Sequence, residues 1–333
     1  MRHRVGRVEC ELNDMPTRRG FVACAAGLLG LAGRSLAAGQ TIRAVVAEDG
    51  TGDFSTIQRA VDHVLDHAPE PVDRVILEIR PGVYRERVKI PQDRPNFTLR
   101  GTDPASTLIT SSMSAKEAGG TFFSPIVEVD GAAFEAVNIS FENSFGEGSQ
   151  AVALAIHSDR AVFRNCRFLG WQDTLYAASG RQYYLDCLIE GAVDFIFGNA
   201  AAVFDHCEIH SRGSGYITAQ SRTRPDEPTG FVFRNCRLTG PSDARVFLGR
   251  PWRSCARVVY LDCWVGDHIR PEGWNDWDNT ANEKTAWFAE LGSSGFGANP
   301  ATRVPWARRI TPAEAAAFAP DQFLKGADGW KPE

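Results

Sequence analysis

Two aspartates lie where the sequence otherwise predicts buried β-structure. In "EGAVDFIFGNA" (residues 190–200), Asp194 lies among apolar residues that are typical of a fully buried strand. A buried carboxylate without a partner is destabilising or takes up a proton. Asp194 lies seven residues after Cys187, and Asp173 lies seven residues after Cys166. If these cysteines mark equivalent places on adjacent strands, the pKa values of the two carboxylates should diverge, leaving one as an acid and the other as an anion. Such a pair is suited to catalysis.

The elements that would position this pair belong to a repeat. One short phrase that alternates apolar and polar residues recurs six times, and Ile139 replaces the cysteine in its first copy. The other copies are "VFRNCRF", "YYLDCLI", "VFDHCEI", "VFRNCRL" and "VYLDCWV", centred on Cys166, Cys187, Cys207, Cys236 and Cys263. A unit that repeats every 20 to 29 residues predicts a solenoid with one strand per phrase. The intervals leave no room for crossover helices, and a leucine-rich repeat pattern is absent. We therefore expect an all-β fold, a parallel β-helix whose neighbouring strands lie ~4.8 Å apart.

Polar residues beside the cysteines recur in the same register. They are Asn165, Asp186, Asn235 and Asp262. Asn and Asp side chains readily bond to nearby backbone, so we interpret these four as turn or ladder residues.

Helical patterns occur at both ends of the repeat. "DFSTIQRAVDHVL" predicts a short amphipathic helix that covers the first open edge of the solenoid, with Ser55 and Gln58 at capping-box spacing. "TPAEAAAFAPDQFL" predicts a helical tail packed on the outside.

The first residues differ from the rest of the chain. Residues 1–38 contain an arginine pair, a short apolar core and a small-residue end, which predicts a signal peptide of the twin-arginine type, with Met15 as an alternative start. Residues 39–333 would then form a single catalytic domain that is exported to the periplasm or the extracellular space. A disulfide between Cys187 and Cys207 is expected there, because the ladder spacing lies inside the usual Cα range for disulfides. The alternative is that the ladder cysteines remain reduced core residues.

Composition limits the partners. The net charge of −5 argues against nucleic acid, and no apolar run after residue 40 is long enough to span a membrane. The chain has no H-E-x-x-H, C-x-x-C or G-x-S-x-G motif. We expect a monomer without a metal ion or an organic cofactor.

Four motifs occur in a fixed order and together resemble the pectin methylesterases (pectinesterases), here of the bacterial exported type. They are "QAVAL" (150–154), "GWQDTLYA" (170–177), "DFIFGNA" (194–200) and "LGRPW" (248–252). The resemblance continues through "DGTGDFSTIQRAVD", "PGVYRERV" and "PEGW", so that it covers most of residues 43–290. It implies a single-stranded right-handed parallel β-helix.

The resemblance also implies roles. Asp194 would be the nucleophile that attacks a methyl ester of galacturonate, and Asp173 would be the proton donor and later the base. Gln172 and Gln150 would stabilise the oxyanion, and Arg250 would orient Asp194 and keep it ionised.

The implied substrate is methyl-esterified polygalacturonate. Trp252, Tyr176, Phe197 and Thr121 would contact it. Three alternatives remain open from the residues alone: a glycosidase that uses the carboxylate pair, a non-catalytic glycan-binding β-helix, and a related esterase that acts on another ester such as a thioester.

Overall fold

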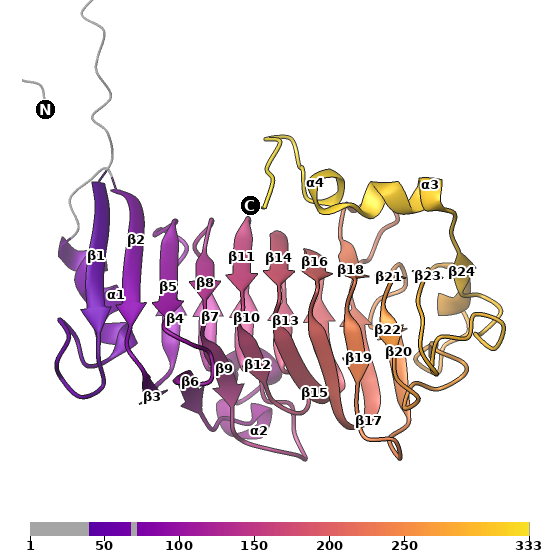
Figure 1. The fold of residues 1–333 in the computed structure, drawn as a ribbon, viewed down its shortest axis with the longest axis horizontal. Coiled ribbons are helices and arrows are strands. Elements are labelled where there is room, and N and C mark those ends of the chain that lie inside the picture. The colour runs from indigo at the N-terminus through magenta and orange to yellow at the C-terminus, as the bar shows by residue number, and fades with distance from the viewer. Residues whose placement is uncertain (1–39, 68–71, 333) are drawn as a thin grey trace, which may run out of the picture. The chain divides into compact units, whose positions relative to one another are not determined.

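The computed structural model describes residues 40–67 and 72–332, and its strands run parallel in three ladders around a common apolar interior (Figure 1). This is the predicted parallel β-helix. The expected leader, residues 1–38, lies outside the described residues.

The first ladder is the longest and contains eleven strands. They are β1 (Gln40–Val46), β2 (Val72–Ile79), β5 (Phe97–Gly101), β8 (Glu135–Val137), β11 (Ala161–Arg164), β14 (Arg181–Leu185), β16 (Ala201–Asp205), β18 (Gly230–Arg234), β21 (Arg257–Leu261), β23 (Trp287–Leu291) and β24 (Arg308–Arg309).

Two long, bent strands, β15 (Leu188–Gly198) and β17 (Glu208–Gln220), belong to both of the other ladders. The second ladder adds β3 (Gly82–Arg85), β6 (Thr107–Ser111), β9 (Ser140–Asn143), β12 (Arg167–Leu169), β19 (Arg237–Thr239) and β22 (Trp264–Val265). The third adds β4 (Val88–Ile90), β7 (Val127–Val129), β10 (Leu154–Ile156), β13 (Leu175–Ala177) and β20 (Val246–Pro251).

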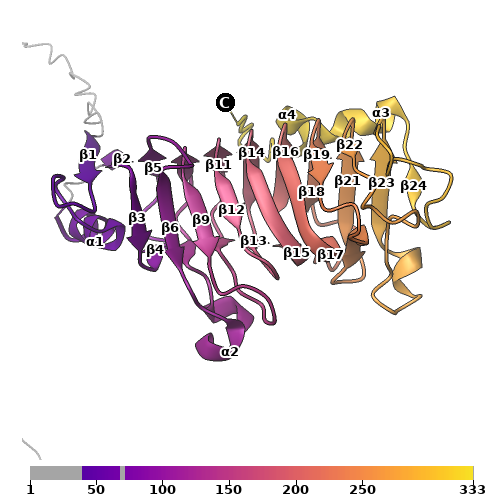
Figure 2. The same cartoon turned by 60° about the horizontal axis from the view of Figure 1, so that its bottom comes forward.

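Helices lie at the ends of the coil and in its loops. They are α1 (Ile57–His67), α2 (Ala115–Ala118), α3 (Pro312–Ala315) and α4 (Pro320–Phe323), with 3₁₀ turns at Thr121–Phe123, Asn282–Lys284 and Ala316–Phe318. Figure 2 shows α2 projecting from the coil on a long loop. No helix in the described part of the chain is long and apolar enough to cross a membrane.

The expected tail covers the outside of the first ladder. Phe318 and Leu324 pack with Val203, Val232 and Val259, the outward apolar side chains of three successive strands. These strands therefore bury both faces, which explains why their sequences read as nearly continuous apolar runs.

The ladder cysteines are stacked in the interior as the repeat predicts, but the expected disulfide is absent. Cys187 and Cys207 are free, and their thiols donate to backbone carbonyls. In-register parallel strands hold successive side chains parallel and ~4.8 Å apart, whereas a disulfide needs Cβ atoms about 3.5–4.5 Å apart. The Cα spacing was therefore a misleading guide.

The polar residues beside the cysteines form the expected turn ladder. Asn165, Asp186, Asn235 and Asp262 all have φ between 48° and 53°, the left-handed conformation that Asn and Asp tolerate best. They turn the chain from the first ladder into the second on each coil.

The N-terminus of α1 is capped by a side chain that is distant in sequence. Glu86 accepts hydrogen bonds from the backbone N–H groups of Ile57 (2.8 Å) and Gln58 (2.9 Å). The capping box expected from Ser55 and Gln58 is not formed, because the Gln58 side chain instead bonds to Asp62 and Lys89. The negative carboxylate also favours the positive end of the helix dipole.

Replacing Glu86 with Gln should therefore lower the free energy of unfolding by ~1 kcal/mol, since the charge and one acceptor oxygen are lost from the helix N-terminus. Urea denaturation measures this, with Glu147→Gln as a control in an exposed loop after β9. Equal stabilities of the two variants would contradict the capping role.

Candidate active site

An open cleft of about 340 Å³ lies on the third ladder. It is lined by eight of the nine predicted site residues, namely Thr121, Gln150, Gln172, Asp173, Asp194, Phe197, Arg250 and Trp252. These side chains come from five of six successive coils, so only the stacking of the coils brings them together.

The two aspartates lie side by side on adjacent coils, as their spacing after the cysteines predicts. Gln172 pairs with Val193 in a parallel bridge, and the backbone N–H of Asp173 donates to the Val193 carbonyl at 3.1 Å. Asp173 and Asp194 are therefore neighbours in register. Both are nearly buried, with 9% and 6% of their surface exposed.

Both aspartates adopt a left-handed backbone conformation. The φ angles are 62° at Asp173 and 51° at Asp194. The register of β15 shifts on either side of Val193, so the strand is irregular where it carries Asp194. These features turn the carboxylates into the cleft, while Phe195 and Ile196 fill the interior. Such conformations carry a cost and occur often at functional sites.

Arg250 pairs with the buried Asp194 through a two-pronged bridge. Its Nε donates to Oδ1 at 2.9 Å and its Nη2 to Oδ2 at 2.6 Å. This geometry uses two in-plane donors of the guanidinium and fixes the carboxylate orientation. It explains how an apolar strand tolerates an aspartate.

The two carboxyl groups differ in their affinity for protons. Burial, with a contribution from the charge of Asp194, raises the pKa of Asp173 to about 8. Burial also raises the pKa of Asp194, but the hydrogen bonds and charge of Arg250 oppose that rise. Arg250 acts in the expected direction without fully cancelling burial. Because Asp173 lacks such a bridge and lies beside an anion, it should hold its proton to higher pH than Asp194.

Gln150 and Gln172 lie in one row beside the aspartates. Their backbones form a parallel bridge to each other, and Gln172 bridges onward to Val193. Both amide side chains line the cleft, where they can donate hydrogen bonds to a bound oxygen.

Aromatic rings form one wall of the cleft. The Phe197 ring stacks on Tyr176 with centroids 4.7 Å apart and lies 6.0 Å from Trp252. Tyr176 is the one predicted residue that does not line the cleft itself, although it supports Phe197. Flat apolar faces of this kind suit the faces of sugar rings and ester methyl groups.

Two cleft aromatics were missed by the sequence analysis. Phe122, half exposed beside Thr121, stacks against Tyr176 and Trp252. Trp277 covers the guanidinium of Arg250, with Cζ 3.8 Å from the ring centroid, and has a φ of 61° that is unusual for a bulky residue. An exposed Phe pair in "GTFF" and the second Trp of "PEGWNDW" were the available signals.

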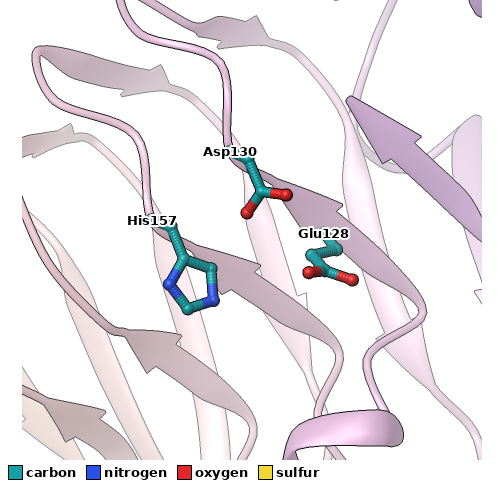
Figure 3. A group of neighbouring side chains, drawn as sticks. All are labelled: Glu128, Asp130 and His157. Atoms are coloured by element: carbon teal, nitrogen blue, oxygen red, sulfur yellow. The ribbon is translucent and has the colours of Figure 1, made fainter. Parts of the chain in front are cut away.

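A charged group lies farther along the same ladder (Figure 3). Glu128 on β7, Asp130 just after it and His157 just after β10 hold their polar atoms within 4.8 Å of one another, a set that could ligate a metal ion. However, Lys89 lies 3.1 Å from Glu128 and 3.4 Å from Asp130. An ammonium group of the chain itself therefore already pairs with both carboxylates.

Comparisons with known proteins agree in one family. The model of the family "Pectinesterase" matches residues 43–327. Pectinesterase 31 of Arabidopsis thaliana is 42% identical over 84% of this chain and 91% of its own length. The pectin methylesterase structure from carrot superposes with a TM-score of 0.81 at 38% identity, covering 86% of this chain and 93% of that one. A pectin methylesterase in complex with a hexasaccharide has a TM-score of 0.74 at 29% identity, covering 88% of this chain and 99% of that one.

Other curated plant relatives are longer. The chain spans only 50–51% of the length of several of them, including proteins from tomato and orange. These relatives are plant proteins, so they give no support to the expected bacterial exported type.

Proposed function

Because the chain belongs to the pectinesterase family, we propose that it hydrolyses the methyl esters of galacturonate units in pectin, releasing methanol and leaving pectate. The observation that carries the proposal is the Asp194–Arg250 bridge beside Asp173 in one cleft. It supplies a fixed anion and a neighbouring acid, the two groups that ester cleavage by a carboxylate requires.

The first half of the proposed reaction forms an acyl-enzyme. A carboxylate oxygen of Asp194 attacks the ester carbonyl carbon, and the carbonyl electrons move to its oxygen. The side-chain amides of Gln172 and Gln150 donate to this oxyanion. The bond to methoxide then breaks as Asp173 gives it a proton, so that methanol leaves and an anhydride joins the substrate to Asp194. The raised pKa of Asp173 supports its role as the acid near neutral pH.

The second half restores the enzyme. Asp173, now an anion, takes a proton from water as the water oxygen attacks the substrate carbonyl of the anhydride. The bond to Asp194 breaks, which leaves the Asp194 carboxylate under the Arg250 bridge and a galacturonic acid unit that releases its proton to solvent as galacturonate. Asp173 is again protonated and ready for the next ester.

Substrate binding is assigned to the aromatic wall. Trp252, Phe197 and Phe122 offer apolar faces to sugar rings, with Tyr176 beside Phe197 on the neighbouring strand and Thr121 also lining the cleft. A hexasaccharide bound to a related methylesterase supports an extended saccharide ligand.

The test is the product pattern on methyl-esterified pectin. Purified protein should release methanol without creating new reducing ends. New reducing ends would identify a glycosidase, and faster cleavage of acyl thioesters than of pectin would identify another esterase. Saccharide binding without any turnover would leave only a glycan-binding β-helix. Each of these three results would overturn the proposal.

We also propose that the protein acts as a monomer outside the cytoplasm, in the periplasm or beyond it, after removal of residues 1–38. The twin-arginine motif of the leader and the accessibility of pectin outside cells support this location. N-terminal sequencing of exported material should find a chain that begins near Gly39. Exported protein that begins at Met1 or Met15 would contradict it.

A further inference from the structure

Arg250 and Asp194 are separated by an intervening strand. Asp194 lies on β15, and the preceding Val193 pairs with Tyr216 on β17. Tyr216 in turn pairs with Phe247 on β20, the strand that carries Arg250. The backbones of β15 and β20 are thus about 10 Å apart, twice the usual strand spacing. The Arg250 side chain must cross β17 to reach Asp194.

The residue beneath this crossing is Tyr216. The Cζ atom of Arg250 lies 3.8 Å from the centroid of the Tyr216 ring and 3.8 Å from that of Trp277 on the opposite face. The guanidinium is therefore held between two aromatic rings, while two of its in-plane donors bind Asp194.

Tyr216 is itself supported from behind. Its ring stacks on Phe247 with centroids 5.3 Å apart and planes 9° apart, and Arg270 lies over the far face of Phe247 at 4.9 Å. This continuous stack fixes the ring under Arg250 even though Tyr216 is only partly buried.

We propose that Tyr216 is a positioning residue for the esterase reaction. Its ring holds the guanidinium of Arg250 in the orientation in which two of its N–H groups bind Asp194. The inference rests on the proposed function. Tyr216 acts through Arg250 and does not line the cleft.

The effect should fall on the nucleophile rather than on substrate binding. Asp173 is the neighbouring titratable group, and Arg250 is the charged group that acts on Asp194 and favours its ionised form. Without the Tyr216 ring, one face of the Arg250 guanidinium loses its contact above β17. The two hydrogen bonds from Arg250 to Asp194 should then be less well ordered. The pKa of Asp194 should then rise, so that a higher pH is needed to form the attacking anion.

The experiment compares Tyr216→Ala, Tyr216→Phe and wild type in methanol release from methylated pectin across pH. In Tyr216→Ala we expect kcat to fall about tenfold with KM within twofold, and the acidic limb of the kcat/KM profile to move up by about 0.5–1 pH unit. Tyr216→Phe keeps the ring and should restore both values. Tyr216→Leu keeps part of the apolar bulk without the π-face and should behave like Tyr216→Ala.

Trp264→Ala is the matched control, because it removes an aromatic ring that covers another guanidinium, that of Arg237, outside the cleft. It should leave the acidic limb where wild type has it. An unmoved limb in Tyr216→Ala, an equal shift in Trp264→Ala, or failure of Tyr216→Phe to restore the limb would each overturn the inference. All three results presuppose methanol release by wild type, so they are distinct from a failure of the proposed function.

Discussion

Asp194→Asn should lose methanol release almost completely, by ~10⁴-fold or more, on every ester tested. The substitution keeps the shape of the side chain and one acceptor oxygen for Arg250, but an amide cannot attack the ester carbonyl. Without the attack no acyl-enzyme forms, and among the residues that the structure describes no other carboxylate shares the Arg250 bridge. Methanol release from methylated pectin by purified protein measures the loss.

The matched control is Asp186→Asn. Asp186 also has a left-handed backbone, with φ of 53°, but lies exposed at a corner of the coil outside the cleft. It should retain wild-type activity, and both variants should keep the circular dichroism of the folded β-helix. If Asp194→Asn works at even a tenth of the wild-type rate, Asp194 is not the nucleophile.

The adjacency of the two aspartates could be predicted because it depends on register. The cysteine phrase repeats once per coil, so equal spacing from Cys166 and Cys187 placed Asp173 and Asp194 on neighbouring strands without any knowledge of the loops. Repetition converts short-range sequence spacing into long-range proximity, which an ordinary globular fold does not allow.

Features that depend on loops and side-chain direction were not predictable in this way. Trp277 reaches Arg250 from an irregular segment beyond the repeat, and Glu86 caps a helix that begins 29 residues earlier. The prediction of a disulfide between Cys187 and Cys207 was wrong. The repeat indicates the spacing of the cysteines along the coil axis, but it does not show that their Cβ atoms point in parallel directions and stay too far apart to be bridged.

Asp173→Asn should have the second largest effect, a loss of ~10²–10⁴-fold in methanol release, because methoxide is a poor leaving group that needs the proton. With an ester that has a good leaving group, such as a p-nitrophenyl ester, the substitution should slow the acylation step less than it does with a methyl ester. Since the base for deacylation is also lost, we expect a burst of about one p-nitrophenol per enzyme followed by a slow phase. If the variant shows no burst while wild type turns over, Asp194 and Asp173 do not have the separate roles of nucleophile and acid–base group.

The pH dependence of the same variant tests the proton on Asp173. In wild type the proton is lost as pH rises through about 8, so methanol release should fall on that alkaline side. The Asp194 anion is needed as well, which sets the acidic limb at lower pH. Asp173→Asn carries no titrating group there, and its residual activity should show no alkaline limb near pH 8. An unchanged alkaline limb would assign it to another group.

The free energy of unfolding should also depend on the Asp173 proton, and the direction of its change with pH can be predicted. The folded pKa of Asp173 is raised above the ordinary value near 3.8, so between pH 4 and about 8 the unfolded chain releases a proton that the folded chain retains. This contribution of Asp173 therefore favours unfolding increasingly as pH rises through that window. Asp173→Asn lacks it and should gain stability relative to wild type on going from pH 4 to pH 8, by ~2 kcal/mol or more. Urea denaturation at both pH values measures the difference, with Asp186→Asn as the control. A difference that does not change with pH would show that Asp173 is ionised in the folded enzyme, and it could not then be the acid.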